Sequence, residues 1–162
     1  MSPYNTVRRI AAELRPSILN DLGLSADLKW QIQAFESRTG IPCRCHGLRE
    51  GLRLGAEPSL AVFRIFQEIM TNVVRHAAAN AVSIRVTAKG GRLTLRVADD
   101  GKGLDPKHPS DSRSLGLLGM RERALLLGGS VDFSARRGGG TVVTVQVPAL
   151  ASEPGPTPLP SV

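Results

Sequence analysis

Two runs of apolar residues at helical spacing open the chain. In the first run, the apolar positions are Val7, Ile10, Ala11 and Leu14. Pro16 should interrupt this helix, because proline lacks the backbone donor that a helix interior needs. In the second run, they are Leu28, Ile32 and Phe35. We expect Ser25 to cap the second helix and Gly40 to end it.

A longer helix is predicted from Glu57-Pro58 to about Ala79, with the proline in its first turn. Its apolar positions are Val62, Phe63, Phe66, Ile69, Met70, Val73, Val74 and Ala77. Together they form a wide face, which is typical of a helix that is buried along one side.

Alternation of apolar and polar residues predicts β-strands elsewhere. Ile41-Pro42 begins an extended segment, and two hairpins follow later. The first hairpin alternates at Val82, Ile84 and Val86 and then at Leu93, Leu95 and Val97. The second alternates at Val131 and Phe133 and then at Val143, Val145 and Val147. The turns are Gly90-Gly91 and Gly138-Gly139-Gly140, since glycine tolerates the backbone angles of tight turns.

The segment from Leu104 to Leu115 is polar and lacks periodicity, which predicts a mobile loop. Gly116-Leu117-Leu118-Gly119 then leads into a short helix through Leu127. After Ala149, proline-rich sequence predicts a disordered tail. The order is helices, strand, long helix, hairpin, loop, helix, hairpin. It predicts an α+β fold: a two-layer α/β sandwich with helices on one face of a mixed, mostly antiparallel sheet.

Composition adds limits on location and partners. The 162 residues suit one domain, and a hydrophobic share of 41% is enough for a core. The net charge of +7 favours an anionic partner. The arginines are spread along the chain without a basic tail, so we expect no direct nucleic-acid binding. No apolar run is long enough to span a bilayer, and no signal-peptide region is seen, so a cytoplasmic location is expected.

Both cysteines occur in Cys43-Arg44-Cys45, next to His46. They would point to the same face of a strand. A structural zinc site needs four ligands, and the other histidines, His76 and His108, are far away in sequence. We therefore expect reduced, partly buried thiols rather than a metal or redox centre.

The polar face of the long helix carries the first candidate chemistry. Glu68, Asn72 and His76 recur every four residues, and Arg75 flanks them. A solvated face is the ordinary explanation for such a stripe. Asparagine, however, is a poor residue for a helix interior, and the Glu68 and Asn72 oxygens are ligands that a Mg²⁺–phosphate complex prefers.

The second candidate is the run Asp99-Asp100-Gly101-Lys102-Gly103 at the end of a predicted strand. Asp99 can accept a hydrogen bond from an exocyclic amine. The two glycines would let a flat ligand lie close to the main chain, because no Cβ intervenes. On its own, the run is better explained as a plain Asp-Asp-Gly turn.

The third candidate is Gly116-Leu117-Leu118-Gly119, where free backbone N–H groups at a helix start would bind phosphate. A glycine hinge is the alternative. Thr141, at the start of the last strand, adds a hydroxyl that would lie near the same pocket or belong to ordinary strand sequence.

Together these elements resemble the ATP-binding domain shared by histidine kinases, gyrase-type topoisomerases, large ATP-dependent chaperones and mismatch-repair ATPases. Glu68 and Asn72 match the N-box of that superfamily, Asp99 to Gly103 the G1 box, and Gly116 to Gly119 the G2 box. The resemblance spans roughly Pro58 to Pro148 and implies the Bergerat-type fold.

A narrower resemblance is to histidine kinases of the nitrate/nitrite-sensor type. It rests on these stretches: Leu14-Arg15-Pro16, Asp21-Leu22-Gly23-Leu24, Asn72 to Ala77, Gly119-Met120-Arg121-Glu122-Arg123 and Gly138-Gly139-Gly140-Thr141. The subfamily implies a phosphorelay to a response regulator with helix-turn-helix output. It also allows that the chain is the cytoplasmic part of a membrane-bound sensor, and a homodimer if the first dimerisation helix is supplied.

The resemblance implies a role for each matched residue. Glu68 would orient or activate the attacking group, and Asn72 would coordinate Mg²⁺. Asp99 would bind the adenine amine. The remaining expected ATP-binding residues are Arg75, His76, Gly101, Lys102, Gly103, Gly116, Leu117, Gly119 and Thr141. ATP and Mg²⁺ are the implied cofactors, and phosphoryl transfer mainly requires positioning and charge neutralisation.

The family's phosphoacceptor histidine lies on a helix upstream of Leu14-Arg15-Pro16, but only thirteen residues precede Leu14 and none is histidine. We therefore expect residues 1–39 to be the last part of a dimerisation region, 40–148 the catalytic domain and 149–162 a tail. Such a chain would bind Mg–ATP and phosphorylate a histidine on another dimerisation domain, not itself.

Two other functions stay open at this point. One is a serine kinase similar to anti-sigma factors, acting on a protein antagonist. The other is a nucleotide-gated binding module that transfers no phosphate.

Overall fold

The computed structural model describes residues 23–49, 52, 54–104 and 111–149, with only the backbone described at 111–113. The predicted helix at Val7–Leu14 lies outside these ranges, as does the predicted tail apart from Ala149. The elements are α2 (Gly23–Thr39), β1 (Cys43–His46), α3 (Ala56–Asn72), η2 (Val73–Ala77), β2 (Val82–Lys89), β3 (Arg92–Asp99), α4 (Asp111–Leu126), β4 (Ser130–Ala135) and β5 (Thr141–Pro148).

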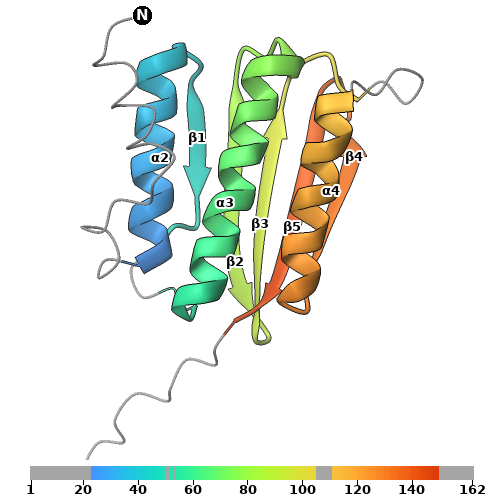
Figure 1. Cartoon of the computed structure of the whole chain (residues 1–162). Helices are drawn as coiled ribbons and strands as arrows, with labels where there is room; N and C mark the ends of the chain where they lie inside the picture. The colour runs from blue at the N-terminus through green and yellow to red at the C-terminus, as the bar shows by residue number, and fades with distance from the viewer. Residues whose placement is uncertain (1–22, 50–51, 53, 105–110, 150–162) are drawn as a thin grey trace, which may run out of the picture.

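The five strands form one sheet in the order β1-β2-β3-β5-β4. Strand β1 runs parallel to β2, and the remaining pairs are antiparallel. Helices α2, α3 and α4 cover the same face of this sheet (Figure 1). The predicted two-layer sandwich with a mixed, mostly antiparallel sheet is therefore confirmed.

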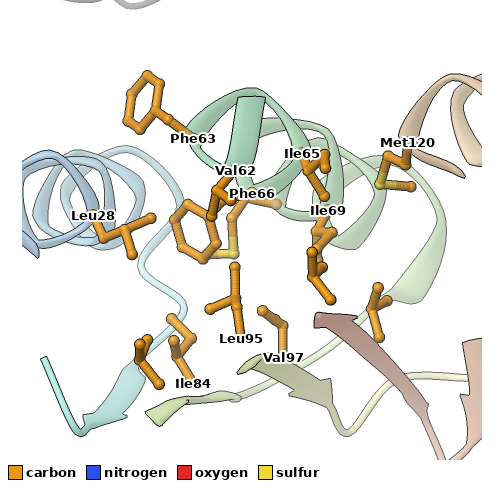
Figure 2. Close-up of a cluster of buried hydrophobic side chains, with 14 of the residues drawn as sticks. Leu28, Val62, Phe63, Ile65, Phe66, Ile69, Ile84, Leu95, Val97 and Met120 are labelled. Carbon is orange, nitrogen blue, oxygen red and sulfur yellow. The ribbon is translucent and has the colours of Figure 1, made fainter. Parts of the chain in front are cut away.

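The core lies between the sheet and the three helices. Strands β2, β3 and β5 turn alternate apolar side chains toward the helices, as the period of two requires. Figure 2 shows the result: Leu28 of α2 and Phe66 of α3 lie above Ile84 and Leu95 of the sheet, and Met120 of α4 lies on the other side of α3, to the right. Because α2 belongs to the same cluster as α3, it is packed as part of this layer rather than apart from it.

Three predicted helix boundaries are wrong. Helix α2 begins at Gly23, so Ser25 is not its cap; its hydroxyl donates instead to the backbone oxygen of Arg49 at 2.7 Å. The long α-helix ends at Asn72 and continues as a π-helix to Ala77, short of Ala79. Helix α4 begins at Asp111, so 111–115 is helical rather than part of a loop.

The cysteine prediction is confirmed in that Cys43 and Cys45 are free and half-buried. Burial, followed by the nearby Glu36 and Cys45, raises the pKa of the Cys43 thiol to about 12. Burial also raises the pKa of Cys45, while Lys29 acts in the opposite direction. Among the described residues, no helix is long and apolar enough to traverse a bilayer.

Candidate functional site

A small pocket lies where α3 and η2 meet the ends of β3, β5 and β4, under the second turn of α4. Four of the residues singled out in the sequence line it, namely Asn72, Asp99, Leu117 and Thr141. The other lining residues are apolar: Ile69, Val73, Ala77, Val97, Leu104, Phe133 and Val143. The fold therefore brings the helix, the Asp-Gly run and the last strand together at one place.

Asp99 is the last residue of β3 and faces the helices because it keeps the alternation of Leu95 and Val97. It is only 6% exposed. One carboxylate oxygen, Oδ1, accepts hydrogen bonds from the backbone N–H of Gly101 at 2.9 Å and of Thr141 at 3.3 Å. No described residue donates to Oδ2, so the second oxygen is available to a ligand.

The neighbouring carboxylate has a different, structural use. Oδ1 of Asp100 accepts the backbone N–H groups of Asn80 at 2.7 Å and Ala81 at 2.9 Å. These bonds, that of Ala81 first, hold the pKa of Asp100 below its ordinary value. They tie the loop after β3 to the residues that lead into β2. Of the two adjacent aspartates, only Asp99 lines the pocket.

Gly101 is required by packing rather than by an approaching ligand. A Cβ at this position would overlap the backbone oxygen of Ala77, at the end of η2. The next residue, Lys102, donates its N–H to that same oxygen at 2.8 Å. A second close approach occurs at Gly140, whose φ is +106 and whose Cβ would overlap the backbone oxygen of Asp99. Gly101 therefore lets the Asp99 loop pack against the end of η2, and Gly140 lets the start of β5 pack against the same loop.

The long helix contributes apolar and polar side chains to the pocket. Ile69, Val73 and Ala77 line it at intervals of four residues, as the predicted apolar face requires. Of the predicted polar stripe, Asn72 lines the pocket, whereas Glu68 and His76 do not. The helix is an α-helix up to Asn72 and a π-helix from Val73 to Ala77.

Several predicted ATP-binding residues lie outside the pocket lining. Arg75 and Lys102 are exposed, and His76 is half-buried. Gly101 and Gly103 belong to the loop after Asp99 but do not line the pocket. Gly103 has a φ of +81, which glycine adopts readily. Whether these residues contact a nucleotide stays a prediction.

Helix α4 closes the open side of the pocket. Gly116 lies inside this helix, so its N–H is not one of the free groups at the helix start. A Cβ at Gly116 would overlap a carboxylate oxygen of Glu68, which shows how closely α4 approaches α3. Leu117 enters the pocket, while Gly119 does not line it. The Arg121 guanidinium lies 5.1 Å from the centre of the Phe133 ring and holds α4 to β4.

Sequence reasoning missed the apolar walls and one cation. Ile69, Val73 and Phe133 carried the periodicities that mark buried faces, but nothing in those patterns separates a pocket wall from the core. Arg136, in the turn between β4 and β5, donates from Nη1 to the backbone oxygen of Asp99 at 3.4 Å. Its contact depends on the pairing of distant strands, which local sequence does not show.

The pocket volume is only about 20 Å³, which is room for roughly one water molecule. A purine ring is much larger, so Leu117 must withdraw before a base can occupy this position. The chemistry of the walls nevertheless suits a base: apolar surfaces and one carboxylate oxygen, Oδ2 of Asp99, that receives no hydrogen bond from the described residues. The described residues contain no cluster of three or more His, Cys, Asp or Glu side chains able to hold a metal ion. A Mg²⁺ ion here would need phosphate oxygens beside Asn72.

Residues 57–151 match the family model described as histidine kinase-, DNA gyrase B-, and HSP90-like ATPase, and this match covers more than half of the chain. The chain belongs to this ATPase family. The matched residues include α3, the Asp99 loop, α4 and both hairpins, which are the elements that form the pocket.

Solved structures share the fold of this ATPase-family domain. The histidine kinase domain of the blue-light activated histidine kinase from Erythrobacter litoralis matches with a TM-score of 0.63 and 23% identity. That match covers 78% of this chain and 61% of the other. Acinetobacter baumannii histidine kinase AdeS matches with a TM-score of 0.59 and 16% identity, over 79% and 66% of the two chains.

The ATP-binding domain of PrrB from Mycobacterium tuberculosis matches with a TM-score of 0.60 and 18% identity. This match covers 80% of the present chain and 96% of that domain. The chain therefore contains nearly all of the fold of one isolated ATP-binding domain.

Proposed function

We propose that this domain binds Mg–ATP and transfers the γ-phosphate to a histidine on a dimerisation domain of a two-component sensor kinase. The observation that carries the proposal is the Oδ2 oxygen of Asp99. It belongs to a buried residue and receives no hydrogen bond from any described residue, in a pocket with apolar walls. The exocyclic amine of adenine supplies the missing donor, and Val73 and Val143 supply flat apolar contact.

The other residues divide into binding and transfer roles. Asn72 lies at the pocket edge and would share Mg²⁺ with the phosphates, which supplies charge neutralisation to the transferred group. Glu68 lies one helical turn earlier, beside Gly116. There it would accept a proton from the attacking imidazole and keep that ring oriented toward the γ-phosphorus.

Binding requires α4 to move. The closed pocket excludes a base, so the observed affinity would be the intrinsic affinity reduced by the fraction of molecules with Leu117 withdrawn. The contacts that resist opening are the Arg121–Phe133 contact, the packing of Leu117, Met120 and Ala124, and the close approach of Gly116 to Glu68. Because Met120 and Ala124 are fully buried, opening would involve the first turns of α4 rather than the whole helix.

Helix α4 also offers a surface for the phosphoacceptor. Leu115, Leu118 and Leu125 are 71%, 52% and 73% exposed. Apolar side chains gathered on one exposed helix are typical of an interface. A helical dimerisation domain packed on them would hold its histidine near Glu68, on the neighbouring helix. Relay to a response regulator with helix-turn-helix output, and membership of the nitrate/nitrite-sensor type, are further parts of this proposal.

Transfer is tested by incubating the full chain with γ-labelled ATP and Mg²⁺, alone and with a separate histidine-bearing dimerisation domain. We expect acid-labile, base-stable label on the added domain only. Glu68→Gln should retain ATP binding and lose most of the transfer, while Arg38→Ala, on the exposed end of α2, should behave like the parent. Acid-stable label on serine, or label on this chain alone, would contradict the proposal.

A further inference from the structure

A second, larger pocket lies toward the end of β2, whereas the start of β2 pairs with Asp99 of the nucleotide site. Its volume is about 550 Å³. It is formed where β2 continues past the end of β1. The residues that matter for its chemistry are His46, Arg49, Leu52, Arg85, Thr87 and Lys89. None of the residues matched to the nucleotide motifs lines it.

The backbone leaves one edge of β2 open at this pocket. Strand β1 pairs with β2 only as far as Arg85, whereas β2 continues to Lys89. Gly90 and Gly91 form a two-residue turn, so Lys89 and Thr87 bond to β3. The N–H and C=O of Ala88 therefore point to the opposite side, where no described strand pairs with them. A peptide N–H is thus available to an anion in the pocket.

The side chains around this edge are cationic and uncompensated. No carboxylate is among the described residues that line the pocket. Within the part of the chain that the structure describes, Arg49, Arg85 and Lys89 form no ion pair. The hydroxyl of Ser25 bonds the backbone oxygen of Arg49 and so fixes the segment that carries this side chain.

The register makes this concentration of charge unfavourable in an empty pocket. Arg85 lies directly opposite Arg96 on β3, and both are exposed. Like charges opposite each other across two strands destabilise the pair. A bound anion at Arg85 would offset part of that repulsion, although Arg96 itself does not line the pocket.

We propose that this pocket binds a small molecule that carries at least two oxyanion groups, phosphoryl or carboxylate. Its volume lies within the usual range for small-molecule sites. Arg49 and Arg85 each offer a fork of donors that matches an oxyanion, and Lys89 adds a third positive charge. No aromatic side chain lines the pocket among the described residues, so it lacks the stacking surface that single-stranded nucleic acid requires.

The test is titration of the ¹⁵N-labelled full chain with inorganic pyrophosphate and, separately, with citrate, without Mg²⁺ and at low salt. We expect saturable shifts of the amide signals of Gly47, Thr87 and Ala88. The relative affinity of the two probes identifies phosphoryl or carboxylate as the preferred group. Arg85→Ala should weaken binding at least fivefold and should keep or raise the melting temperature, because it relieves the repulsion from Arg96.

Arg38→Ala is the matched control, since it removes one exposed positive charge from α2 outside the pocket. It should leave both affinities unchanged. The proposal is overturned if neither probe gives saturable shifts, if the shifts occur only at Gly101 and Gly103 of the nucleotide site, or if the two arginine variants weaken binding equally. The amide shifts are measured in and beside β2, away from the nucleotide site. Failure of the chain to bind ATP would therefore not change this test of the second pocket.

Discussion

Replacing Gly101 with alanine separates two explanations for a glycine at this position. On one explanation the glycine gives a flat ligand access to the main chain; on the other it lets the loop pack against η2. The structure favours packing, because the added Cβ would overlap the backbone oxygen of Ala77 and approach the Ala77 Cβ to 2.8 Å. The φ of Gly101 is not in the left-handed region, so alanine adds no backbone strain.

The expected cost follows from that overlap. Inserting a methyl group into a packed site costs about 1–3 kcal/mol. Relief of the overlap also requires the loop to move away from Ala77, which lengthens the 2.8 Å bond from the Lys102 N–H and costs about 1 kcal/mol more. We therefore expect Gly101→Ala to lower the free energy of unfolding by about 2–4 kcal/mol.

Urea unfolding at fixed pH measures this change, with ATP binding measured on the same samples. Gly119→Ala is the matched control. Its Cβ would meet only the end of Arg123, at 3.6 Å, in the interior of α4. It should therefore raise the free energy of unfolding by about 0.5–1 kcal/mol through helix propensity.

An unchanged urea midpoint for Gly101→Ala, together with a large loss of ATP affinity, would refute the packing argument. That result would show that the position is reserved for the ligand. Equal destabilisation by Gly101→Ala and Gly119→Ala would also refute it, since only the first substitution meets fixed backbone atoms.

Three further outcomes are expected. Asp100→Ala should lower the melting temperature at pH 7 without removing ATP binding. Because the pKa of Asp100 is depressed in the folded state, its carboxylate stabilises the protein above the unfolded-state pKa, and this stabilisation should fade as the pH falls through the lower folded-state pKa. Thermal melts of both proteins at stepped pH would detect the change. Cys43 should react with iodoacetamide at pH 8 far more slowly than a free thiol, since its pKa is about 12, and rapid labelling of the native protein would contradict that. Gly116→Ala should displace the Glu68 carboxylate, changing stability by less than about 1 kcal/mol because that side chain is flexible, and should slow phosphoryl transfer more than ATP binding in the labelling assay.

Much of the fold was predictable because its elements carry strong periodicity. In both hairpins, apolar and polar residues alternate on either side of a glycine turn, which predicts the strands. The same alternation places Asp99 on the face of the sheet that the helices cover. The start of α4 was missed because 111–115 has no apolar repeat, and Gly116 and Gly119 look like a hinge. At Gly116 the missing side chain lets α4 approach Glu68 closely, whereas Gly119 has no such contact.

The site was predictable in its members more than in its geometry. Asn72 and Asp99 were found from local motifs, and both line the pocket. The π-turn at Val73–Ala77 was not foreseen, since nothing in that stretch of sequence distinguishes a π-turn from an α-turn. The sequence assigned the base contact to Asp99 but predicted no role for Asp100, because the partners of Asp100 lie about twenty residues away.

Calorimetric titration of Mg–ATP into the parent chain and into Asp99→Asn tests the central claim most directly. Asparagine keeps the size of the side chain and one acceptor for the backbone bonds of Asp99, but it places an amide N–H₂ or an uncharged oxygen where the adenine amine requires a carboxylate. The account predicts saturable binding of one ATP by the parent and affinity about 10- to 100-fold lower in the variant, with little change in melting temperature. Equal affinity in the two proteins would contradict it.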